Sequence, residues 1–139
     1  MYKLSDDKKY LDESFFAAKV LTEQQNEKGG WVSNPDMCAL AGMSHGASGI
    51  IYALAKVNYY KADKQVLLSI EKGLNFEKNL YDDIYNNWKD ERYYKGKKIS
   101  ESNNFTVAWC HGAPGILLSR LRLLELLKGE KYEGLMIYT

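Results

Sequence analysis

The stretch TVAWCHGAPGI, at residues 106–116, decides the local fold of this chain. Gly112 and Gly115 allow a tight turn or a close backbone approach that a side chain would block. Pro114 has a fixed φ and no amide hydrogen, which suits the first turn of a helix. An apolar run follows at residues 116–127. The pattern therefore predicts a sharp turn around Cys110 that leads directly into a helix.

A second stretch, GMSHGASGI at residues 42–50, repeats this pattern. Both stretches contain His-Gly-Ala-x-Gly-Ile, starting at His45 and at His111, and five of the six positions are identical. Each copy leads into an apolar segment. Two such copies predict an internal repeat with equivalent helix starts.

The rest of the chain is dominated by apolar residues at helical spacing. This spacing predicts helices at residues 8–25, 47–60, 64–80 and about 113–128, the third capped by Asp63 and the fourth ended by Gly129. Between the third and fourth helices lies a long polar connection, with a basic cluster at residues 95–98 that is typical of a solvated loop. We expect residues 105–109 to be extended or a short strand, and the apolar residues 135–138 to begin a further segment. The sequence thus predicts an all-α chain of four to five helices with one long loop.

Length and charge narrow the possible functions. The chain has 139 residues, enough for one domain with a core, and 19 basic against 18 acidic side chains give a net charge of +1. This balance gives no electrostatic reason to expect nucleic acid or an anionic membrane surface. No run approaches the ~18 apolar residues of a membrane-spanning helix. The polar N-terminus does not resemble a signal peptide. We therefore expect a cytoplasmic protein without membrane insertion, whose two cysteines are thiols rather than a disulfide.

Cys110 and His45 are the two candidate functional residues. A cysteine thiolate can bind zinc or act as a nucleophile. The alternative, a buried cysteine that behaves as a small hydrophobe, is favoured for Cys38. A lone histidine is more often structural than catalytic, and for His45 the residues alone leave both readings open. The three tryptophans are expected to anchor the core or the loops: Trp31, Trp88 and Trp109.

Residues 42–50 and 108–116 resemble two signature motifs of the lanthionine synthetase C-like family. Residues 76–81 and 87–92, between them, resemble the family segment that precedes its Trp-Cys-His-Gly motif. The form AWCHGAPG is most similar to the C-terminal cyclase domain of bifunctional class II lanthipeptide synthetases. The resemblance runs from about residue 31 to residue 124. It implies an α/α toroid, with helices in two concentric layers, of which residues 1–139 would be a partial cyclase domain, incomplete at both ends.

The resemblance also implies a chemistry. In this family a cysteine of the precursor peptide adds to a dehydroalanine or dehydrobutyrine and forms a thioether ring. Zinc favours the thiolate, and an acid/base group handles the proton. Carried over by position, Cys110 matches the first zinc ligand and His45 matches the acid/base histidine, whereas His111 matches no ligand.

The family's other two zinc ligands come from a Cys-His-Gly motif further towards the C-terminus, and its assisting aspartate would lie before Met1. We therefore expect the isolated chain to bind zinc weakly or not at all and to be inactive. Cys38 and His111 could in principle substitute as ligands.

Two other interpretations remain open. One is a LanC-like module that binds thiols or peptides without forming rings. The other is an unrelated helical toroid in which both motifs only shape helix starts. Whichever function applies, an incomplete toroid would leave apolar helix faces without partner helices. We therefore expect the chain to self-associate. The residues expected on these faces are Leu67, Ile70, Leu118 and Leu121.

Overall fold

The computed structural model describes residues 5–33, 37–91, 93–94, 97–98, 105–128 and 132. Its helices in these ranges are α2 (Lys8–Glu23), α3 (Ala47–Tyr60), α4 (Lys64–Leu80) and α5 (Ala113–Leu126). The strands have two residues each: β1 (Tyr81–Asp82), β2 (Asn87–Trp88), β3 (Tyr93–Tyr94) and β4 (Lys97–Lys98). They pair antiparallel, β1 with β2 and β3 with β4. The predicted all-α class is confirmed, and each predicted helix is present.

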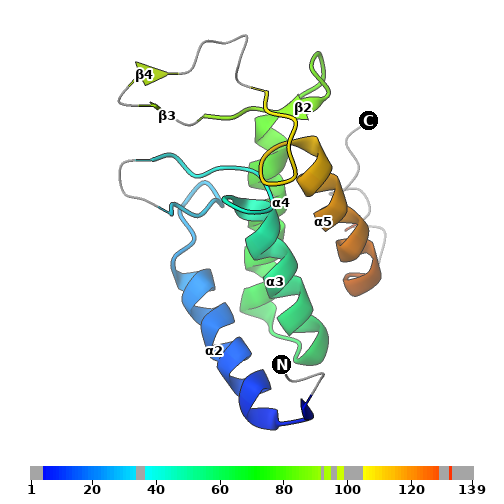
Figure 1. Cartoon of the computed structure of the whole chain (residues 1–139). Helices are drawn as coiled ribbons and strands as arrows, with labels where there is room; N and C mark the ends of the chain where they lie inside the picture. Colours follow the sequence, from blue (N-terminus) through cyan, green and yellow to red (C-terminus); the bar gives the residue numbers. More distant parts are fainter. Residues whose placement is uncertain are drawn as a thin grey trace.

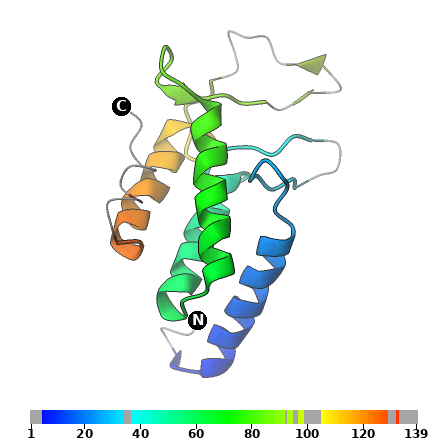
Figure 2. The same ribbon diagram turned by 180° about the vertical axis from the view of Figure 1, so that it is seen from behind.

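The helices pack around one core. α3 and α4 lie side by side at the centre, with α2 against one side of this pair and α5 against α3 on the other (Figures 1 and 2). Burial of apolar side chains between these helices is the main stabilising contribution. The large apolar side chains that are completely buried there are Ile51, Leu54, Ile70, Leu74, Ile116 and Leu123.

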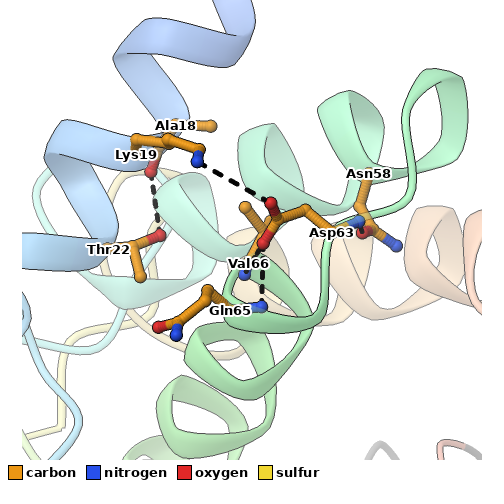
Figure 3. A network of polar contacts seen from close by, with 7 residues as sticks. All are labelled: Ala18, Lys19, Thr22, Asn58, Asp63, Gln65 and Val66. Carbon is orange, nitrogen blue, oxygen red and sulfur yellow. Dashed lines mark hydrogen bonds and ion pairs between the residues drawn. The ribbon is translucent and has the colours of Figure 1, made fainter.

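α2 and α4 begin at aspartates that cap them. The Asp63 carboxylate accepts hydrogen bonds from the amides of Gln65 and Val66, at 2.8 and 3.1 Å, as the sequence predicts for a helix cap. Figure 3 shows that Asp63 also faces Lys19 of α2, with 4.0 Å between Nζ and Oδ2. The same carboxylate therefore starts α4 and faces a cation of α2.

The first part of the long connection after α4, residues 81–88, forms a hairpin that its polar sequence does not predict. The β1–β2 hairpin begins directly at the end of α4, and the rings of Tyr81 and Trp88 pack edge to face across it with centroids 5.0 Å apart. Residues 105–109 form no strand, although a short strand was one of two expectations for them. The ring of Phe105 instead stacks on Tyr85, 4.1 Å away.

One expectation about open apolar faces is wrong. Ile70 is completely buried in the core, because it faces α3 and the other buried side chains of α4, and Leu67 is partly buried against the same core. Leu118 and Leu121 of α5 are exposed, as expected. Self-association stays a prediction.

Several sequence predictions fall outside the described residues: the side chains of the basic cluster at 95–98, the helix stop at Gly129 and the apolar segment at 135–138. Within the described part of the chain, no helix is long and apolar enough to cross a membrane.

Candidate functional site

Two loops of equal length precede α3 and α5. We call residues 40–46 the histidine loop and residues 106–112 the cysteine loop. A Cβ atom added to Gly46 would lie 2.4 Å from the carbonyl oxygen of Leu40, and one added to Gly112 would lie 1.8 Å from that of Thr106. In both loops the glycine that ends the loop thus packs against the backbone six positions earlier. The predicted repeat of helix starts is confirmed.

The second glycine of each motif follows the same rule. A Cβ atom on Gly49 would lie 2.1 Å from the carbonyl oxygen of Met43, and one on Gly115 would lie 1.9 Å from that of Trp109. A side chain at either position would displace the backbone, so both glycines are required by close approach.

The two loops touch each other where α3 and α5 begin, at the same end of these two helices (Figure 1). The amide of Ser44 donates a hydrogen bond to the carbonyl oxygen of Cys110 at 3.2 Å. A Cβ atom on Gly42 would lie 2.9 Å from that same oxygen, so this glycine lets the loops approach. The structure therefore brings the candidate residues His45 and Cys110 into loops that are in direct backbone contact.

His45 is exposed and lies at a pocket of about 880 Å³. It is the one titratable side chain among the residues that line this pocket, and most of the others are apolar or small. The lining residues on α2 and the segment after it are Leu21, Gln24, Trp31, Val32 and Ser33, and those on the histidine loop and α3 are Met43, Ser44, His45, Gly46, Gly49, Ile50 and Ala53. The imidazole is thus accessible to a ligand in a pocket whose described lining residues include no Asp, Glu, Lys or Arg.

Cys110 carries a free, half-buried thiol. Its neighbour Trp109 is 56% exposed, so this tryptophan does not belong to the core, which was one of the two positions expected for it. Trp31 and Trp88 are buried in the core, as expected.

His111, although adjacent to Cys110, points into the protein. Its imidazole is 1% exposed, and its Nε2 lies 3.3 Å from Oδ2 of Asp90, which is equally buried. The hydroxyl of Thr106 donates to the same carboxylate oxygen at 3.3 Å. The imidazole of His111 is thus held against Asp90 in the interior, whereas the thiol of Cys110 is half-buried.

Asn87 ties the two ends of the cysteine loop. Its Oδ1 accepts hydrogen bonds from the amides of Ala113 and Trp88, both at 2.9 Å. Its Nδ2 donates to the carbonyl oxygen of Thr106 at 3.1 Å. A single buried carboxamide therefore contacts the first residue of the loop and the first residue of α5.

Glu77 of α4 does the same for the histidine loop. Its completely buried carboxylate accepts hydrogen bonds from the backbone amides of Gly42 and Ser48 and from the Ser48 hydroxyl. Arg120 of α5 pairs with its other oxygen. Burial raises the pKa of Glu77, while the charge of Arg120 and these hydrogen bonds act in the opposite direction. α3 has no cap from its own Gly46, and Glu77 supplies the acceptor instead.

Sequence reasoning missed Glu77, Asn87 and Asp90 as site residues. One signal was present for Glu77, because a charged residue follows Ile70 and Leu74 at the spacing of the buried face of α4. Asn87 and Asp90 gave no such signal.

The described residues do not by themselves fit a zinc ion. They contain no group of three or more His, Cys, Asp or Glu side chains that could hold a metal. A zinc site needs three or four protein ligands, and Cys110 is at most one of them.

The fold and the site define an all-α protein in which repeated glycine-turn helix starts present a histidine and a thiol from adjoining loops. The family model described as lanthionine synthetase C-like protein matches residues 1–137. The chain belongs to the lanthionine synthetase C-like family. Comparison with curated proteins and with solved structures found no match.

Proposed function

We propose that this chain is part of a lanthipeptide cyclase domain of the class II type, which forms thioether rings in a precursor peptide. Family membership supports the reaction class. The observation that carries the proposal is the hydrogen bond from Ser44 to Cys110, which places His45 and Cys110 on touching loops. A metal-binding thiol and an acid/base group can act on one substrate only if they are held this close.

In the proposed reaction, a thiolate of the peptide attacks the β-carbon of a dehydroalanine or dehydrobutyrine. A carbon–sulfur bond forms, the carbon–carbon π electrons move towards the carbonyl, and the resulting enolate takes a proton at its α-carbon. We assign this proton transfer to His45, because an imidazole both accepts and donates protons. We assign Cys110 to one zinc ligand, with the others outside the described residues.

The pocket beside His45 supports a peptide substrate. Its volume of about 880 Å³ has room for several side chains, and its described lining residues include no Asp, Glu, Lys or Arg. An uncharged peptide segment that contains a dehydrated residue fits this chemistry.

The test uses the full-length protein with a dehydrated, cysteine-containing precursor peptide. Cys110→Ala should lose both zinc and ring formation. His45→Ala should keep zinc and slow ring formation about 100-fold or more. Cys38→Ser, the matched thiol control, should change neither. Metal analysis gives the zinc content, and mass spectrometry after thiol alkylation counts the rings. Normal ring formation by His45→Ala would rule out the assigned role.

A second candidate is a LanC-like module that binds thiols or peptides without ring formation. The pocket of about 880 Å³ beside His45 would hold a peptide in this case as well. This candidate predicts that the unaltered full-length protein binds the dehydrated peptide and leaves all its thiols free, an outcome that the same alkylation assay detects.

A further inference from the structure

We propose that Asn87 is a positioning residue: it fixes the cysteine loop so that Cys110 stays in contact with Ser44 of the histidine loop. The importance of this contact for catalysis rests on the proposed function. The contact itself is a property of the fold and can be measured without any substrate.

Asn87 is the link between the two ends of the cysteine loop. It uses both atoms of its carboxamide, since Oδ1 accepts from Ala113 and Nδ2 donates to Thr106. Both backbone groups lie beside Gly112, where the chain has a φ of +107°. Removing the carboxamide would leave a part-buried donor and a part-buried acceptor without these partners, which favours opening of the loop.

The histidine loop is fixed independently by Glu77. Its carboxylate holds the amides of Gly42 and Ser48, and Arg120 holds the carboxylate from α5. Glu77 lies on α4, and Asn87 lies on the hairpin that follows α4 without interruption. Both loops are therefore fixed to one continuous segment, and the contact from Ser44 to Cys110 lies between the two anchors.

Formation of an engineered disulfide measures how close residues 44 and 110 lie. Two cysteines form an unstrained disulfide only when their Cα atoms are about 4.4–6.8 Å apart. Ser44 is exposed and its backbone is bonded to that of Cys110, so Ser44→Cys in a Cys38→Ser background creates one possible pair. The effective concentration of these two thiols relative to each other is measured from the equilibrium of their disulfide with reduced and oxidised glutathione.

Asn87→Ala should lower this effective concentration about tenfold or more, because the loop opens when its ends are released. Gln25→Ala is the matched control. The Gln25 carboxamide also makes three hydrogen bonds, to Gly29, to the Ser69 carbonyl and to the Ser69 hydroxyl, but it joins α2 and its turn to α4 away from the loops. It should leave the effective concentration unchanged.

An unchanged value in folded Asn87→Ala, or an equal fall in Gln25→Ala, overturns the proposal. Hydrogen exchange in the unaltered chain provides a second test that does not depend on the variant folding. The amides of Ala113 and Trp88 should exchange only through global unfolding. Exchange of either amide by local opening overturns the proposal. Neither measurement involves ring formation, so a protein that fails to cyclise peptides can still pass both tests.

Discussion

The histidine loop and the cysteine loop start helices with the same His-Gly-Ala-x-Gly-Ile pattern, yet they present different side chains. In the first loop, His45 is exposed beside a pocket. In the second, the equivalent His111 is buried against Asp90, and Cys110 takes the half-buried position before it. The shared letters determine where the backbone turns. The position of His111 depends on a residue outside the motif, because its imidazole lies 3.3 Å from the buried carboxylate of Asp90.

The anchors of the two loops also differ. The histidine loop is held by the buried carboxyl group of Glu77, which pairs with the likewise buried guanidinium of Arg120. The cysteine loop is held by the neutral carboxamide of Asn87, which donates and accepts without a counter-ion. Glu77 lies on α4 and Arg120 lies on α5, and the loop itself leads into α3. Because a buried polar group is costly to leave unpaired, the histidine loop depends on the packing of these three helices. The cysteine loop depends instead on the β1–β2 hairpin.

The largest expected effect separates the two loop-ending glycines. Gly112→Ala should destabilise the chain by roughly 4 kcal/mol, because a side chain meets both a φ of +107° and a backbone oxygen at 1.8 Å. Gly46→Ala meets a backbone oxygen at 2.4 Å but has an extended backbone with a φ of −144°, so its loss should be smaller. Urea unfolding of both variants measures the difference. Equal losses would mean that the strained φ of the cysteine loop contributes nothing.

A middle-sized effect distinguishes the two histidines. His111→Ala should destabilise the chain by about 3 kcal/mol, because it opens a cavity and deprives buried Asp90 of a partner. His45→Ala should change stability by less than about 0.5 kcal/mol, because the side chain is exposed. Thermal or urea unfolding tests the pair. A large loss for His45→Ala would show that this histidine is structural, which would also weaken the assignment of proton transfer to it.

The contrast between the loops marks the limit of sequence-based prediction here. Helical spacing predicted all four described helices, and the Asp63 cap could be read from neighbouring residues. The anchors could not, because Asn87 lies 26 positions from Ala113 and Glu77 lies 43 positions from Arg120. Local patterns carry no information about such pairings. For the same reason, the motif letters alone could not show which histidine faces outwards.

The smallest expected effect concerns Asp82, which closes the turn of the β1–β2 hairpin. This hairpin carries Asn87, the anchor of the cysteine loop. Oδ1 of Asp82 accepts hydrogen bonds from the amides of Ile84 and Tyr85, and Oδ2 of the same carboxylate lies 3.2 Å from Nζ of Lys89. Desolvation alone would raise the pKa of Asp82, but the hydrogen bond to Lys89, the two amides and the lysine charge together lower it below the ordinary value of 3.8.

A carboxylate with a lowered pKa in the folded state stabilises the protein above its unfolded pKa. Asp82→Asn keeps an oxygen for the two amides but loses the pair with Lys89, so it should be slightly less stable than the unaltered chain at pH 7. As the pH falls below 3.8 towards the lower folded value, the unaltered chain takes up a proton at Asp82 and this advantage disappears. Urea unfolding at pH 7 and at pH 3 measures both differences, with Asp83→Asn, an exposed neighbour, as the control for the change in net charge. A difference between Asp82→Asn and the unaltered chain that is the same at both pH values would show that the charge of Asp82 does not support the hairpin beneath the cysteine loop.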